Sequence, residues 1–107
     1  MKVKHAILRA RADQDVQEAI EYYLGEGAQQ AALGLVDALE RALQHIEHYP
    51  ATGSPRYAHE LDLPGLRCWQ VKGYPYVVFY VEGDNHVDVW RVLHGSRDLP
   101  TWLQAPE

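Results

Sequence analysis

Three arginines and one histidine in the second half of the sequence are the side chains best suited to chemistry. Arg67, Arg91 and Arg97 carry fixed positive charges, and His94 can exchange a proton near neutral pH. Cleavage of a phosphodiester through a neighbouring hydroxyl needs a base, an acid for the leaving oxygen, and cations that stabilise the charged transition state. These four residues supply those types. Beyond Arg97, however, the chain contains no Tyr, His, Lys or Arg, so its last ten residues add no further group of these types to such a site.

A metal site or a reactive thiol has weaker support in the sequence. His45, Glu47 and His48 stand at helical spacing, but no further ligand follows at matching spacing, so we interpret them as a solvated helix end. Cys68 is the only cysteine, which excludes an internal disulfide and is typical of a reducing compartment. We therefore expect no metal and no other cofactor, and we interpret Cys68 as a small strand residue.

Length and charge restrict the class of protein. A chain of 107 residues with 47% apolar content predicts a single domain over residues 1–107. The net charge is −5, and both halves of the chain carry more acidic than basic residues, which argues against direct nucleic-acid binding through phosphate contacts. No apolar run is long enough for a signal peptide or a membrane span. We expect a soluble cytoplasmic protein with no membrane partner.

The elements that must position these residues begin with a strand and two helices. Residues 3–8 form a short apolar run that predicts a strand. From Arg11 to Leu24 the apolar residues recur at spacings of three and four, which predicts an amphipathic helix with Asp15 and Glu18 on its polar face. Two glycines in residues 25–27 predict a tight reversal. A second helix is then expected from about Ala28 to His48, antiparallel to the first.

The rest of the chain predicts a connector and three strands. Residues 50–65 hold three of the six prolines and are expected to be irregular. Strands are expected at 66–71, 74–81 and 86–93, joined by a two-residue turn at Lys72-Gly73 and a turn at 83–85. Residues 99–103 are expected to add a short turn of helix. The fold class is therefore α+β, of order β-α-α-β-β-β, with a helical hairpin packed on an antiparallel sheet.

Alternation along the last two strands assigns side chains to the two faces of the sheet. The set expected to pack on the helical hairpin consists of Val77, Phe79, Val81, Val87, Val89 and Leu93. The opposite, aromatic-rich set consists of Tyr76, Val78, Tyr80, Trp90, Val92 and His94. Water alone would cover this second set poorly. Arg91 alternates with Val89 and Leu93, so it is equally well read as a structural arginine paired with a carboxylate or with backbone carbonyls.

With this order of elements, the sequence resembles the RelE/ParE superfamily of bacterial toxins, and most closely its ParE branch. The resemblance spans nearly the whole chain, and its most specific part is the final motif. It is carried by Ala12-Asp13, Tyr23, Pro50, Gly53, Pro64-Gly65-Leu66-Arg67, Tyr76-Val77-Val78-Phe79-Tyr80 and Arg91-Val92-Leu93-His94-Gly95-Ser96-Arg97-Asp98.

The resemblance implies the toxin of a type II toxin–antitoxin system, neutralised by a cognate antitoxin whose C-terminal segment wraps over it. ParE-like members inhibit DNA gyrase, whereas RelE-like relatives cleave messenger RNA on the ribosome. The acidic charge and the absence of basic residues after Arg97 favour the gyrase inhibitor, which has no catalytic residues. The alternatives are an RNA endonuclease using Arg67, Arg91, His94 and Arg97, and a module that binds antitoxin but has lost toxicity. The residues expected to contact a partner are Arg67, Tyr76, Tyr80, Trp90, His94, Arg97 and Trp102.

Overall fold

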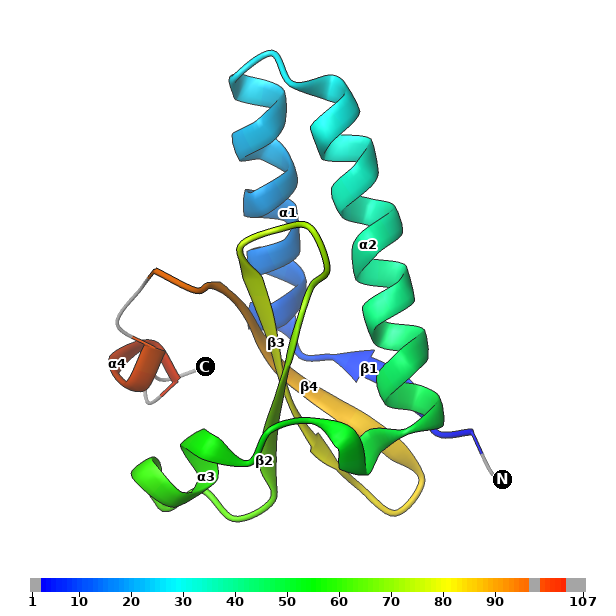
Figure 1. The fold of residues 1–107 in the computed structure, drawn as a ribbon, viewed down its shortest axis with the longest axis vertical. Helices are drawn as coiled ribbons and strands as arrows, with labels where there is room; N and C mark the ends of the chain where they lie inside the picture. The colour runs from blue at the N-terminus through cyan, green and yellow to red at the C-terminus, as the bar shows by residue number, and fades with distance from the viewer. Residues whose placement is uncertain (1–2, 97–98, 104–107) are drawn as a thin grey trace.

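The computed structural model describes residues 3–96 and 99–103, which fold into two layers of helix around one sheet (Figure 1). No helix within these ranges is both long and apolar enough to cross a lipid bilayer. In chain order the elements are β1 (His5–Leu8), α1 (Ala10–Gly25), α2 (Gln29–His48), the 3-10 turn η1 (Pro50–Thr52), α3 (Arg56–Leu61), β2 (Leu66–Gln70), β3 (Tyr76–Glu82), β4 (His86–His94) and α4 (Leu99–Leu103).

The sheet has four strands in the order β1-β4-β3-β2. Strands β2, β3 and β4 form the antiparallel meander that the sequence predicts. Strand β1 lies on the other side of β4 and runs parallel to it, with His5 opposite His86 and Leu8 opposite Val89. The α+β class and the helical hairpin are confirmed, and the sheet is mixed because its first strand joins in parallel.

Helices α1 and α2 form an antiparallel hairpin whose free end extends beyond the sheet (Figure 1). Both helices bury the small or branched side chains of their apolar stripes, among them Ala12, Ala19, Leu35 and Ile46. Gly27 closes the reversal with a φ of 73°, a left-handed conformation that glycine adopts without steric cost.

The sheet separates two hydrophobic cores, and their membership reverses the predicted faces. Tyr76, Val78 and Tyr80 of β3 pack beneath the hairpin together with Val87, Val89 and Val92. Phe79 and Leu93 lie on the opposite face with Leu66, Leu99 and Leu103, and Val77, Val81 and Trp90 pack against them. The prediction that Val77, Phe79, Val81 and Leu93 face the hairpin is therefore wrong, whereas the placement of Val87 and Val89 is confirmed.

A β-bulge explains why alternation fails in β4. Phe79 pairs with Arg91 and the next residue, Tyr80, pairs with Val89, so Trp90 is an extra residue in the ladder. Side chains that follow the bulge change face relative to strict alternation. As a result Val92, and not Leu93, joins Val89 beneath the hairpin.

Two further elements differ from the sequence prediction. The connector contains helix α3, whose Tyr57, Ala58 and Leu61 pack on the second core; the Tyr57 ring stands edge-on to Phe79 at 5.6 Å. The loop between β2 and β3 spans residues 71–75 in place of a two-residue turn. Its Tyr74 hydroxyl donates a hydrogen bond of 2.7 Å to the Ala31 carbonyl, which ties the loop to α2.

Tyr80 of β3 binds the connector to the sheet through its hydroxyl group. Its ring is fully buried, and its hydroxyl donates to the Pro50 carbonyl at 2.8 Å and accepts the Gly53 N–H at 3.1 Å. Burial raises the pKa of Tyr80 above its usual value, although the Gly53 hydrogen bond and the Arg67 charge oppose the rise. The folded protein therefore holds the phenol in its protonated form.

Tyr80→Phe is expected to lower the free energy of unfolding by about 1–2 kcal/mol, because the buried Gly53 N–H loses its acceptor. Since the folded pKa lies above the unfolded one, the tyrosine's stabilisation is complete below the ordinary tyrosine pKa of 10.0 and declines as the pH rises through the folded pKa. Urea unfolding between pH 8 and pH 11 checks both points. An equal alkaline loss of stability in the wild type and in Tyr80→Phe would contradict this role.

Candidate functional site

The candidate site lies where β4 extends past the end of its neighbour β1. The ladder between these strands ends at Leu8 and Val89, because the chain turns at Arg9 into α1. Among residues 3–96 and 99–103, no strand pairs with the remainder of β4, up to His94, on that side. Helix α1 lies alongside this edge.

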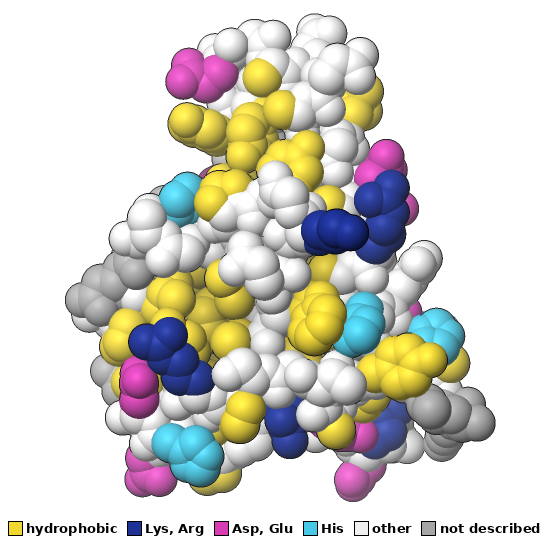
Figure 2. Space-filling model, in the orientation of Figure 1, with side chains coloured by type: hydrophobic (Ala, Val, Ile, Leu, Met, Phe, Trp, Pro, Cys, Tyr) yellow, Lys and Arg dark blue, Asp and Glu magenta, His cyan; other side chains and the backbone are white. Residues whose placement is uncertain are grey.

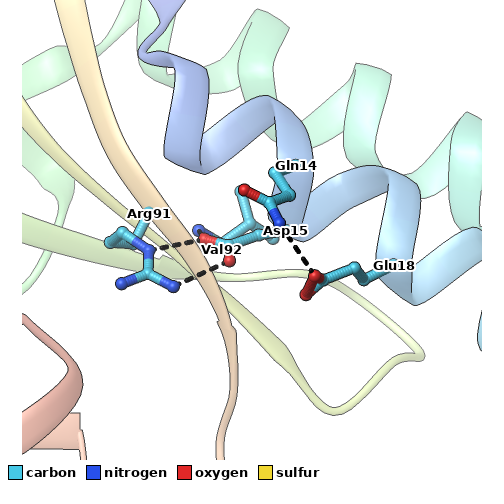
Figure 3. Close-up of polar contacts among 5 residues, drawn as sticks. All are labelled: Gln14, Asp15, Glu18, Arg91 and Val92. Atoms are coloured by element: carbon cyan, nitrogen blue, oxygen red, sulfur yellow. Dashed lines mark hydrogen bonds and ion pairs between the residues drawn. The ribbon is translucent and has the colours of Figure 1, made fainter. Parts of the chain in front are cut away.

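A carboxylate from α1 occupies the position that a strand would otherwise take (Figure 3). The Asp15 Oδ2 accepts the Val92 backbone N–H at 3.1 Å. The same carboxylate binds the Arg91 guanidinium through both oxygens, with Nε at 2.7 Å and Nη2 at 2.8 Å. This bidentate geometry is the strongest form of an arginine–carboxylate pair.

Both members of this ion pair are buried. Asp15 is 9% exposed and Arg91 is 4% exposed. Arg91 lies opposite Phe79 in the ladder, so its side chain starts on the face of the second core and reaches Asp15 around the strand edge. The structural interpretation of Arg91 is thereby confirmed. The placement of Asp15 on the polar face of its helix is wrong, since it lies at the spacing of Ala12 and Ala19, which are both buried.

A groove of about 520 Å³ opens between α1 and this half of β4. Its wall on the helix side is formed by Asp15, Glu18, Ala19, Tyr22 and Tyr23, and its other wall by Pro75, Tyr76, Val92, Leu93, His94 and Ser96. The rings of Tyr22 and Tyr23 meet edge to face at 5.3 Å. The groove is therefore aromatic along α1, and the Asp15 carboxylate in its wall is paired with Arg91.

His94 stands in the groove against Tyr76, with ring centroids 5.4 Å apart. Its Nδ1 accepts the Ser96 backbone N–H at 3.1 Å and lies 2.7 Å from the Ser96 hydroxyl. In this arrangement Nδ1 serves as the acceptor for the Ser96 backbone N–H.

The other predicted partner contacts do not converge on this groove. Arg67 lies on β2 beside Tyr80, and its Nη1 donates to the Gly53 carbonyl at 2.8 Å. Tyr80 is fully buried and its hydroxyl is already bound. Trp90 belongs to a separate cluster, in which its Nε1 donates to Asp88 and the Arg9 guanidinium lies 4.8 Å above its ring. Of the predicted residues whose side chains the structure describes, Tyr76 and His94 line the groove.

Arg97 and the side chain of Trp102 lie outside the described part of the chain. The two helix-end histidines have other partners: the His45 Nε2 lies 2.9 Å from the Thr52 hydroxyl with its ring stacked on Trp69, and the His48 Nδ1 lies 2.8 Å from the Gln44 carbonyl. Within residues 3–96 and 99–103, no three His, Cys, Asp or Glu side chains come together as metal ligands.

Charge is distributed unevenly around the groove. Residues 12–40 contain seven Asp and Glu residues and no Lys, Arg or His. Figure 2 shows the consequence on one face, where the free end of the hairpin carries hydrophobic and acidic side chains and the basic ones lie nearer the sheet. Tyr22, Leu24 and Leu33 of this end are 59%, 50% and 64% exposed.

Sequence reasoning missed Asp15, Glu18 and Tyr22 as groove residues. The sequence did hold a signal for Asp15. It stands three residues after Ala12 and four before Ala19, so it shares their buried face of the helix, and a buried carboxylate needs a cation. The signal for Glu18 and Tyr22 was absent, since their role depends on the place where β1 ends.

Comparison with known proteins agrees with this architecture. The family model of the ParE toxin of the type II toxin–antitoxin system parDE matches residues 6–99. A chain of a chromosomal ParDE toxin–antitoxin system from P. aeruginosa has the same fold, with a TM-score of 0.70 at 14% sequence identity, over 86% of this chain and 96% of that one. No curated protein matches the chain in sequence.

The family match includes both walls of the groove and all strands of the sheet. It extends from within β1 to the first residue of α4, so nearly every described element contributes to it. The chain belongs to the ParE toxin family of type II toxin–antitoxin systems.

Proposed function

We propose that this protein arrests growth by inhibiting DNA gyrase without covalent chemistry of its own, and that a cognate antitoxin neutralises it in the cytoplasm. Membership of the ParE family supports the toxin and its antitoxin partner. The Asp15–Arg91 ion pair is the observation that favours a non-catalytic action. The pair engages Arg91, one of the three arginines that the endonuclease alternative would use.

A nuclease of this fold would need its cations and its proton donor to face one phosphate. Arg91 is buried against Asp15, and the Arg67 guanidinium is bound to the Gly53 carbonyl on the far side of β3. His94 turns its Nδ1 toward Ser96 and packs on the Tyr76 ring. The separate engagements of Arg67, Arg91 and His94 support the proposal of a non-catalytic action.

Expression of the toxin alone should stop DNA replication and induce the DNA-damage response, and coexpression of the antitoxin should abolish both effects. Replication is measured by thymidine incorporation, and damage by a reporter of the response. Continued growth with a stably folded, soluble toxin would favour a module that binds antitoxin but has lost toxicity. Arrest with intact replication and specific cuts in translated messages would favour the endonuclease.

His94→Ala separates the two modes of action further. A proton-transfer role would cost on the order of 10²–10⁴ in cleavage rate. We expect toxicity within about twofold of the wild type, because His94 acts here through packing on Tyr76 and a local hydrogen bond to Ser96. The dose of inducer that halves the growth rate is the measurement. Complete loss of toxicity in a His94→Ala protein of unchanged melting temperature would contradict a non-catalytic mechanism.

A further inference from the structure

Among the described residues, Glu18 is the acidic residue of the groove that has no ion-pair partner. Its carboxylate is exposed at the rim, one turn of α1 after Asp15 (Figure 3). The polar contact it makes is with the Gln14 side-chain amide, at 3.3 Å, a neutral group four residues earlier on the same helix. Asp15 differs, because Arg91 already neutralises it.

The residues around Glu18 restrict which partners can bind at its carboxylate. No cation exists in residues 12–40 to compete for it, so the potential along this side of the groove is negative. Directly beside it stand Tyr22, which is 59% exposed, and the half-buried Tyr23. A carboxylate next to exposed aromatic rings fits a partner that presents a cation adjacent to a bulky apolar side chain.

The backbone at the floor of the groove is already engaged. Asp15 accepts the Val92 N–H that an added strand would need at this edge. The outer strands of the sheet, β1 and β2, also have hydrogen-bond or bridge partners at their free edges. The Glu47 carboxylate accepts the Ala6 N–H at 2.7 Å on β1, and Ser54 pairs with Cys68 on β2. A strand added at Val92 would have to displace Asp15, which favours recognition of a partner in the groove through its side chains.

From this geometry we infer that Glu18 determines partner specificity: the groove accepts an antitoxin segment that places a Lys or Arg against Glu18 and a large apolar side chain on Tyr22 and Tyr23. This inference rests on the proposed function, because it names the chemistry by which the antitoxin is recognised. One charge pair at the rim of an otherwise apolar contact gives an affinity that falls only modestly with salt.

The test measures binding of the full-length toxin to the small protein encoded by the reading frame adjacent to the toxin gene. Glu18→Gln should raise the Kd about tenfold, and Glu18→Lys about a hundredfold, because reversal adds repulsion to the loss of a charge-assisted hydrogen bond. Glu21→Gln and Glu21→Lys are the matched controls. Glu21 is exposed on the same helix and does not line the groove, so both should remain within twofold of the wild type.

A charge swap identifies the partner residue. Each Lys and Arg in the toxin-binding segment of the antitoxin is changed singly to Glu, and one such variant should restore binding to Glu18→Lys. An unchanged Kd for Glu18→Lys, or a loss that none of these antitoxin variants restores, would overturn the inference while the proposed function stands. Failure of the wild-type toxin to bind the antitoxin at all would instead refute the proposed function. Thermal unfolding confirms that the toxin variants are folded.

Discussion

Arg91→Ala should lower the free energy of unfolding by about 3–5 kcal/mol, the cost of removing one partner of a buried ion pair. The substitution leaves the Asp15 carboxylate, which is 9% exposed, without the guanidinium that binds both its oxygens. The Val92 N–H would still donate a hydrogen bond to the carboxylate at this strand edge. Urea unfolding followed by circular dichroism gives the free energy.

Arg56→Ala is the matched control for this prediction. Arg56 also pairs with a carboxylate, Glu60, but at 3.5 Å on the exposed surface of α3, and such pairs contribute little. Its free energy of unfolding should remain within about 0.5 kcal/mol of the wild type. An Arg91→Ala protein as stable as Arg56→Ala would contradict the buried pair. Replacing Asp15 and Arg91 together by apolar residues should restore much of the stability, because no charge is then left buried alone.

Phe79→Ala should destabilise the protein by about 3–5 kcal/mol, through lost burial and the cavity that remains. The Phe79 ring is fully buried in the second core, between Leu66 and Leu93 of the sheet and Leu99 and Leu103 of α4. Because these contacts lie on the face away from the hairpin, the damage should be greatest in α3 and α4. Amide hydrogen exchange by mass spectrometry resolves this distribution.

The exchange pattern also tests the assignment of the two faces. Protection in residues 56–61 and 99–103 should fall more than protection in α2, which packs on the opposite core. Val78→Ala is the comparison, since its side chain is fully buried beneath the hairpin. The reverse pattern, with α2 losing protection in Phe79→Ala, would place Phe79 beneath the hairpin, on the face expected from the sequence.

Hydrophobic periodicity and turn residues were sufficient to predict the helical hairpin, the meander and their order. Those features are local, since they depend on spacings of three and four residues in α1 and α2 and on β-rich runs in β3 and β4. The parallel pairing of β1 with β4 was beyond such reasoning, because it joins residues about 80 positions apart in the chain. Helix α3 was missed because three prolines near it dominate the local signal.

The candidate site was less predictable than the fold. Tyr76 and His94 were singled out from the sequence and do line the groove. The bulge at Trp90 places the side chains that follow it in β4 on the faces opposite to those that alternation predicts. No residue type in the sequence marks a bulge. The role of Asp15 depends on β1 ending at Leu8, which exposes the Val92 N–H to a helix side chain. Such consequences of strand length appear only in three dimensions.

Assay of purified toxin on purified gyrase tests the proposed function most directly. Supercoiling of relaxed plasmid by gyrase should stop at a toxin concentration that leaves messenger RNA on translating ribosomes intact, and addition of the antitoxin should restore supercoiling. The Arg56→Ala toxin should behave as the wild type, since that pair lies on the surface of α3. Uninhibited gyrase together with specific cleavage of ribosome-bound message would contradict the non-catalytic mechanism and assign the protein to the RNA-cleaving class.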